Sequence, residues 1–254
     1  MAVRSEDRTP ALYRATYTVV KPLLMALWRP SADGLEHVPR RGPAILAANH
    51  LSFLDSFFLP AALDRPVFYL GKSDYFSGWQ RHFFEGVGVM PVARQGGDAG
   101  EASLRKGEEV LNSGRLLGIY PEGTRSPDGR LYRGKTGPAR LALRTGAPVI
   151  PVGLIGTGDV LPTGAKIPRV RKVAIRIGRP LDLAARYGTS DQDRFALRSA
   201  TDELMYELMM LTGQEYVDEY AAKVKSGEVT IGSGDLEELG GLLDEAPYPL
   251  QRAS

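Results

Sequence analysis

The feature that most constrains the fold is a regular alternation of short apolar strand patterns with helical patterns. The expected strands are Ala44–Ala48, Val67–Gly71, Val87–Val92, Leu116–Tyr120, Val149–Leu154 and Val173–Ile177. Helical patterns lie between them at Phe53–Leu63, Ala99–Leu111 and Pro138–Arg144. Alternation of this kind predicts an α/β fold, with a mostly parallel sheet covered by helices on both faces.

The 254 residues fit one α/β domain with appendages. We expect an amphipathic N-terminal segment (1–30), a main domain (31–225) and a tail (226–254) that is rich in glycine and acidic residues and partly disordered. A long helix is predicted from Arg194 to about Leu211, continuing towards Val224.

The N-terminal segment contains an amphipathic helix pattern from Ala11 to Trp28. Its polar stripe consists of Arg14, Thr18 and Lys21. The opposite, apolar residues are Leu12, Val19, Val20, Leu23 and Leu27. Pro22 predicts a kink or a division of the helix. Two interpretations stay open: the helix packs on the domain, or it lies in the plane of a membrane, with Trp28 and Arg29 at the interface.

Composition excludes several kinds of chemistry. There is no cysteine, so the chain has no disulfide, no thiolate metal site and no cysteine nucleophile, and it suits a reducing cytosol. With only His37, His50 and His82, a histidine-built metal site is not expected. A net charge of +2 is too small to suggest nucleic acid as a partner. No apolar run reaches the roughly 20 residues of a spanning helix, and acidic Glu6 and Asp7 argue against a signal peptide.

The most informative segment follows the first strand of the main domain and runs Ala48-Asn-His50-Leu-Ser52-Phe-Leu-Asp55. Ser52 and Asp55 have the spacing of a helix capping box, which is a structural explanation for the acid. That explanation leaves His50 unaccounted for. A carboxylate in the first helical turn can hold one imidazole nitrogen and leave the other to act as a base. The pair therefore favours general-base catalysis.

Charged residues, most of them basic, follow the other strands. Lys72 comes after the second strand, Arg94 after the third, and Glu122 with Arg125 after the fourth. The carboxyl ends of parallel strands share one edge of the sheet, where ligands of α/β proteins bind. Arginine grips phosphate through two hydrogen bonds and lysine supplies a point charge. The pattern suits a phosphorylated acceptor whose hydroxyl must lose a proton.

Four ordered blocks resemble those of the glycerolipid acyltransferases, most of all the lysophosphatidic acid acyltransferases. The blocks are His50-x-x-x-x-Asp55, Gly88-Val-Met-Pro-Val-Ala-Arg94, Tyr120-Pro-Glu-Gly-Thr-Arg125 and Val149-Ile-Pro-Val152. The likeness extends from Gly34 to about Pro180 and implies the fold of that family. Tyr120 replaces the family's usual phenylalanine, and Ala93 stands where an acid is common.

The resemblance implies a role for each matching residue. His50 is the general base and Asp55 orients it, while Arg94 holds the phosphate of the acceptor. Glu122 and Gly123 shape the glycerol pocket.

The remaining positions follow in the same way. Thr124 and Arg125 lie beside the glycerol pocket, and Pro151 is tied to donor binding or to the shape of the site. Lys72 and Lys135 match further basic positions of the family.

The implied reaction transfers a fatty acyl chain from acyl-coenzyme A or acyl carrier protein to a hydroxyl of 1-acyl-glycerol 3-phosphate, making phosphatidic acid. The thioester is a co-substrate, and no cofactor or metal is expected. Glycerol 3-phosphate or another lysolipid is the alternative acceptor. The expected partner is a phospholipid surface, with the protein peripheral at the cytoplasmic face of the membrane.

Rival functions are weaker. Gly129-x-x-x-x-Gly134-Lys135-Thr136 satisfies the phosphate-loop pattern, but no strand leads directly into it. A serine hydrolase lacks its Gly-x-Ser-x-Gly turn. A non-catalytic lipid-binding module would not need the His–Asp pair. The aromatic stretch Tyr75–Phe84, which contains His82, is read as core packing, or alternatively as an entrance for acyl chains or a second membrane contact.

Overall fold

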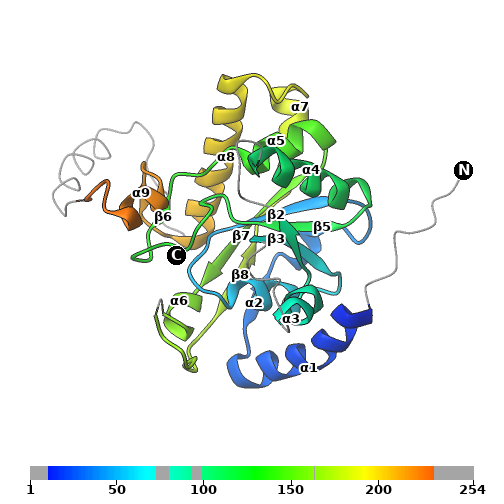
Figure 1. Cartoon of the computed structure of the whole chain (residues 1–254), viewed down its shortest axis with the longest axis vertical. Coiled ribbons are helices and arrows are strands. Elements are labelled where there is room, and N and C mark those ends of the chain that lie inside the picture. The colour runs from blue at the N-terminus through cyan, green and yellow to red at the C-terminus, as the bar shows by residue number, and fades with distance from the viewer. Residues whose placement is uncertain (1–10, 73–79, 93–98, 163, 232–254) are drawn as a thin grey trace, which may run out of the picture.

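The computed structural model describes residues 11–72, 80–92, 99–162 and 164–231 and shows the predicted α/β architecture (Figure 1). Within these residues seven strands form one sheet in the order β1-β8-β7-β2-β5-β3-β4. They are β1 (Ser31–Asp33), β2 (Ala44–Ala48), β3 (Val67–Lys72), β4 (Val89–Val92), β5 (Leu116–Ile119), β7 (Val149–Ile155) and β8 (Ala174–Ile177). The five strands from β7 to β4 are parallel, whereas β8 runs antiparallel to β7 and pairs with β1 in parallel. The mostly parallel sheet is therefore confirmed.

Strand β2 lies in the middle of the sheet and is buried along its whole length. Ala44, Leu46 and Ala48 belong to the core on one face, and Ile45 and Ala47 to the core on the other. A strand that is buried on both faces needs a continuous apolar run, which is what this segment has. The central strand is thus determined by its own composition.

Helices cover both faces (Figure 1). One face carries α1 (Ala11–Trp28), α2 (Asp55–Ala62) and α3 (Gln80–Gly86), and the other carries α4 (Ala99–Asn112), α5 (Gly137–Thr145), α7 (Leu183–Tyr187) and α8 (Arg194–Thr212). Short turns of helix occur at η1 (Leu35–His37) and α6 (Thr157–Val160). The predicted helices are confirmed to within one or two residues at most ends.

The predicted continuation of the long helix towards Val224 is wrong. Asp193 caps the start of α8 by accepting hydrogen bonds from the backbone N–H groups of Phe195 and Ala196, and the helix ends at Thr212. Gly213 follows with φ 67°, a left-handed conformation that glycine adopts without steric cost and that terminates helices.

After α8 the chain forms a small second sheet. Strand β9 (Tyr216–Val217) pairs in parallel with β6 (Leu131–Tyr132), and α9 (Ala221–Ser226) follows. Tyr132, Val217 and Ala221 are buried together as a separate small core. This arrangement attaches the segment after α8 to the loop that follows β5, as Figure 1 shows by the proximity of β6 and α9. The expected tail lies outside the described residues from position 232 onwards.

The N-terminal helix α1 packs on the domain, as the first of the two sequence interpretations predicts, and it also exposes an apolar face. Tyr13, Tyr17 and Leu24 are buried in the core of the domain, so one face packs on α2 and α3. A different face exposes an apolar stripe, which consists of Leu12, Val19, Leu23 and Leu27. The helix runs through Pro22 without division. Trp28 packs edge-on against Phe58 and donates a hydrogen bond to the Arg169 carbonyl, so its ring is used within the domain.

Candidate active site

The centre of the site is the pair of His50 and Asp55 in the loop between β2 and α2. His50 Nδ1 lies 2.9 Å from Asp55 Oδ2. The His50 side chain is 17% exposed, and that of Asp55 is fully buried. No residue that the structure describes bonds to His50 Nε2, so this nitrogen remains available to a substrate hydroxyl. When Nδ1–H donates this hydrogen bond to Asp55, the neutral imidazole carries its free lone pair on Nε2, which is the arrangement of a general base.

Asp55 also organises the loop that carries the histidine. Its Oδ2 accepts hydrogen bonds of 2.8 Å from the backbone N–H groups of both Leu51 and Ser52. The bond from Ser52 N–H is one half of the predicted capping box. The other half is not formed, because the Ser52 hydroxyl accepts from Leu54 N–H, whereas Asp55 N–H donates to the Ser52 carbonyl. Capping and orientation of the imidazole are therefore two uses of one carboxylate.

An aromatic side chain supports the imidazole from one side. The rings of His50 and Tyr120 are stacked with centroids 3.8 Å apart and planes inclined by 11°. Tyr69 lies 5.8 Å beyond Tyr120 in a similar orientation, and the Tyr120 hydroxyl is 2.8 Å from Ser56 Oγ. The resemblance treats Tyr120 as a mild departure, but it does not indicate this contact with the histidine. The stack restricts rotation of the imidazole.

Glu122 bonds to the backbone of two separate segments. Its side chain is buried, and its two oxygens accept backbone N–H bonds of 3.0 Å, Oε1 from His50 and Oε2 from Tyr132. Burial raises the pKa of the Glu122 carboxyl to about 7, against the opposing effect of these two hydrogen bonds. The carboxylate thus fastens the histidine loop to β6.

The turn after β5 brings basic groups towards the histidine. Ser126 N–H donates a 2.7 Å hydrogen bond to the His50 carbonyl, which places the neighbouring Arg125 beside the catalytic loop. Gly123 has φ 72°, and a Cβ atom on it would lie 3.1 Å from Lys135 Nζ, so the Lys135 side chain crosses this turn. Thr124 Oγ1 accepts a 3.1 Å hydrogen bond from Lys225 Nζ.

The remaining predicted site residues are Lys72, Arg94 and Pro151. Lys72 is the last residue of β3 and is in register with Val92 of β4, so both strands end at the expected edge of the sheet. Arg94 lies outside the described residues. Pro151 is buried inside β7 in register with Ala47, and its ring faces Gly178 rather than His50. Its backbone carbonyl accepts a hydrogen bond from Gly178 N–H.

Two polar residues near the site have no counterpart among the predicted ones. Asn49 exchanges two hydrogen bonds with the backbone of Leu154, at the carboxyl end of β7, and its amide also donates to Gln214 Oε1 at 2.8 Å. Gln214 Nε2 in turn donates to the Gly129 carbonyl. These bonds tie the segment after α8 to the catalytic loop. The position of Asn49 directly before His50 is the only sequence signal for this network.

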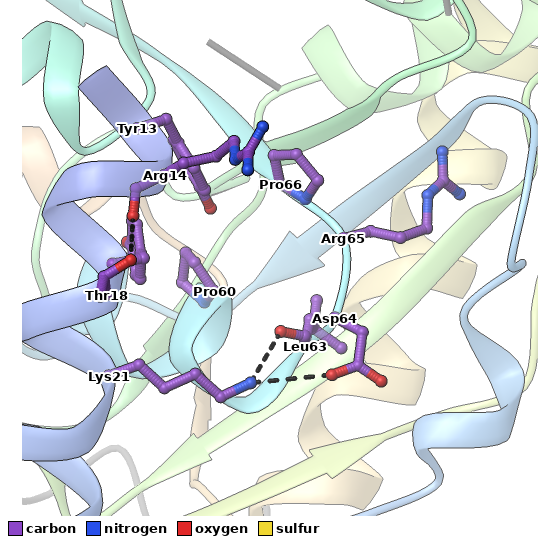
Figure 2. Close-up of a pocket in the computed structure, with 10 residues that line it drawn as sticks. Tyr13, Arg14, Thr18, Lys21, Pro60, Leu63, Asp64, Arg65 and Pro66 are labelled. Carbon is purple, nitrogen blue, oxygen red and sulfur yellow. Dashed lines mark hydrogen bonds and ion pairs between the residues drawn. The ribbon is translucent and has the colours of Figure 1, made fainter. Parts of the chain in front are cut away.

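A cavity of about 320 Å³ lies elsewhere, between α1 and the connection from α2 to β3 (Figure 2). Figure 2 shows Lys21 reaching across it to the Leu63 carbonyl and to Asp64, at 3.3 and 3.7 Å. Because α2 starts beside His50 and runs away from it, this cavity is at the opposite edge of the sheet. We therefore place the chemistry at His50 and not in the cavity.

The phosphate-loop pattern has no structural support. Strand β6 occupies residues 131–132 within the Gly129–Thr136 segment, and strand β5 ends at Ile119, well before it. A phosphate loop joins a strand directly to a helix, so that backbone N–H groups surround the phosphate.

Fold and site together define an α/β protein with a hydrogen-bonded His–Asp pair at the carboxyl edge of its sheet. Comparison with known proteins gives the family. A model of the Acyltransferase family matches residues 29–155, and this chain belongs to that family. The matched residues include His50, Asp55 and the turn from Glu122 to Arg125, but neither Gln214 nor Lys225.

Individual relatives agree with this assignment. The chloroplastic 1-acyl-sn-glycerol-3-phosphate acyltransferase LPAT1 of Arabidopsis thaliana is 36% identical over 139 residues, which are 53% of this chain and 38% of that protein. The corresponding protein of Bacillus subtilis is 25% identical over 201 residues, 78% of this chain and 96% of its own length. This chain spans about two fifths of the length of the plant relatives it matches.

A solved structure supports the fold. The crystal structure of the 1-acyl-sn-glycerophosphate (LPA) acyltransferase PlsC from Thermotoga maritima has a TM-score of 0.60 with 22% sequence identity. The similarity covers 87% of this chain and 81% of the other.

Proposed function

We propose that this protein transfers a fatty acyl chain from a thioester to the free hydroxyl of a 1-acyl-glycerol 3-phosphate, yielding phosphatidic acid. The observation that carries the proposal is the 2.9 Å contact between His50 Nδ1 and Asp55 Oδ2, which leaves Nε2 open. The names of the relatives supply the acceptor, and the donor is acyl-coenzyme A or acyl carrier protein.

In the proposed step, His50 Nε2 removes the proton from the acceptor hydroxyl as its oxygen attacks the thioester carbonyl carbon. The C–S bond then breaks, an ester C–O bond replaces it, and the leaving thiolate takes up the proton from the imidazolium. Buried Asp55 stabilises the imidazolium that forms in between. General-base assistance of this kind contributes roughly 10² to 10⁴ in rate. Arg125, with Lys135 and Arg94, holds the acceptor phosphate.

The proposal also includes a membrane surface, because the acceptor is a lipid. No helix in the described ranges is long and apolar enough to cross a membrane. The apolar stripe of α1 is exposed, and Phe53 and Phe83 expose further aromatic surface at 43% and 40%. Phe53 lies in the loop between His50 and α2, so a bilayer in contact with these groups would present its lipids close to the base. We propose peripheral attachment at the cytoplasmic face.

The test is a steady-state assay of thiol release with purified protein. Two acceptors, glycerol 3-phosphate and its 1-acyl derivative, are each combined with acyl-coenzyme A and acyl carrier protein donors. Turnover that requires the 1-acyl acceptor supports the proposal, whereas preference for glycerol 3-phosphate moves the function to the first acylation step. Absence of acceptor-dependent thiol release with every pair would leave only a lipid-binding role.

A further inference from the structure

Helix α9 lies after the residues that match the family, yet it contacts the loop that carries the basic groups of the site. Leu131 and Tyr132 of β6 pair with Tyr216 and Val217 of β9, and Arg133 N–H donates to the carbonyls of Val217 and Glu219. Tyr132 is fully buried in the small core that includes Ala221 of α9. The position of α9 relative to the turn after β5 is therefore determined by packing and backbone hydrogen bonds.

This attachment brings a third cation to the turn. Lys225 Nζ donates a 3.1 Å hydrogen bond to Thr124 Oγ1, directly before Arg125. Lys135 comes from the other side, with its Nζ 3.1 Å from where a Cβ on Gly123 would be. Partial burial lowers the pKa of Lys225, and the nearby Arg125 guanidinium lowers it further, while Glu122 opposes this shift. Lys225 and Arg125 are thus close enough to repel each other.

No carboxylate neutralises this group in the described part of the chain. Arg125, Lys135 and Lys225 form no ion pair there. Glu122, the acid that raises the pKa of Lys225, uses both oxygens for the backbone N–H groups of His50 and Tyr132. Elsewhere on the same elements cations are paired: Arg130 with Asp128, and Lys223 with Glu219. A fold that holds like charges together without a counterion gains free energy when an anion binds between them.

We propose that Lys225 completes, with Arg125 and Lys135, a subsite for a phosphate monoester dianion, and that α9 is part of the substrate site. This inference rests on the proposed function. A phosphate monoester occurs in both substrates, as the phosphate of the acceptor and as the ribose phosphate of coenzyme A. The proposed function places the phosphate of the acceptor in this subsite, and the ribose phosphate of coenzyme A is the alternative that the kinetics distinguish.

The experiment compares three variants with the wild type. Lys225→Met removes the charge and keeps the aliphatic stem, Lys225→Arg keeps the charge, and Lys223→Met removes an equal charge two residues away on α9. The Michaelis constants for acceptor and donor and kcat are measured for each variant, after cooperative melting shows an intact fold. Binding of glycerol 3-phosphate and of coenzyme A is also measured by calorimetry, which does not depend on turnover.

Loss of one charge-assisted contact to phosphate raises a dissociation constant by about tenfold or more. We expect Lys225→Met to raise the Michaelis constant of one substrate by about tenfold with kcat nearly unchanged, and Lys225→Arg to restore most of it. An effect on the acceptor assigns the subsite to the acceptor phosphate, and an effect on the donor assigns it to coenzyme A. If Lys225→Met matches Lys223→Met in kinetics and in binding, the inference is wrong. If the wild type binds these phosphates through Lys225 but shows no transfer, the proposed function fails and the subsite stands.

Discussion

Glu122 Oε1 accepts a 3.0 Å hydrogen bond from the backbone N–H of His50, so a buried acid on a later loop holds the backbone of His50 in place. The second oxygen binds Tyr132 N–H in the same way. The carboxyl group thereby joins the loop after β2 to the small β6–β9 sheet. These two hydrogen bonds fix the position of the loop that carries His50.

Replacing Glu122 by glutamine should change how stability depends on pH. The pKa of Glu122 is raised from 4.5 to about 7 in the folded protein, so the folded state binds more protons than the unfolded state between these values. The free energy of unfolding of the wild type should therefore fall by about 3 kcal/mol, relative to Glu122→Gln, as pH rises through that window. Urea unfolding of both proteins at pH 4.5, 5.5, 6.5 and 7.5 measures this difference in the free energy of unfolding. Glu36→Gln, at an exposed acid, is the control, and parallel curves for wild type and Glu122→Gln would contradict the prediction.

Removal of the base should abolish most turnover without unfolding the protein. We expect His50→Ala to lower kcat by roughly 10² to 10⁴, since general-base assistance has that size. The kcat of Asp55→Asn should fall nearly as far, because the amide cannot balance the charge of an imidazolium. His82→Ala, at an exposed histidine on α3, is the matched control and should retain full activity. A well-folded His50→Ala protein with turnover close to wild type would remove the proposed mechanism.

Loss of the arginine beside the His50 loop should weaken binding of the acceptor. Arg125→Ala removes a charge-assisted contact to phosphate, worth about 1.5–3 kcal/mol, so the Michaelis constant of the acceptor should rise by at least about tenfold. Arg94→Ala is expected to act likewise. Arg41→Ala removes the same charge at the opposite edge of the sheet, before β2, and should leave this constant unchanged. A rise in the donor's constant alone would show that Arg125 binds the thioester.

The network behind the catalytic loop should affect kcat more than binding. Gln214→Leu keeps the approximate volume but removes the bonds to Asn49 and to the Gly129 carbonyl, so the His50 loop loses one restraint. We expect kcat to fall several-fold, with both Michaelis constants nearly unchanged. Gln214→Glu keeps the hydrogen-bond acceptor for Asn49 and should recover part of the lost kcat. Equal loss in both variants, or a change confined to melting temperature, would restrict Gln214 to a structural role.

The exposed stripe of α1 should contribute to membrane binding. Deleting the first 30 residues would remove Tyr13, Tyr17 and Leu24 from the core, so substitution is the cleaner test. The triple variant Val19→Gln, Leu23→Gln and Leu27→Gln should float less with anionic vesicles than wild type while melting at a similar temperature. Phe195→Gln, at a residue that is 82% exposed on α8, is the control for general loss of apolar surface. Equal flotation of all three proteins would assign α1 to the domain core alone.

The sequence by itself determined the central strands, the main helices and the pairing of His50 with Asp55. The apolar run Ala44–Ala48 fits a strand buried on both faces, and Gly146 marks the end of α5 by its preference for a left-handed conformation. His50 and Asp55 are five residues apart, so their contact depends on one loop and the start of one helix.

Only the tertiary structure decided which distant groups surround that base. Glu122 reaches the His50 backbone, Tyr120 stacks on its ring, and Lys225 arrives from beyond α8 because the short strands β6 and β9 pair. Two-residue strands carry too little pattern to be predicted. The free energy that places them comes from burial of Tyr132 against Val217 and Ala221, residues that are far apart in the chain and become neighbours only after the sheet and α8 have packed.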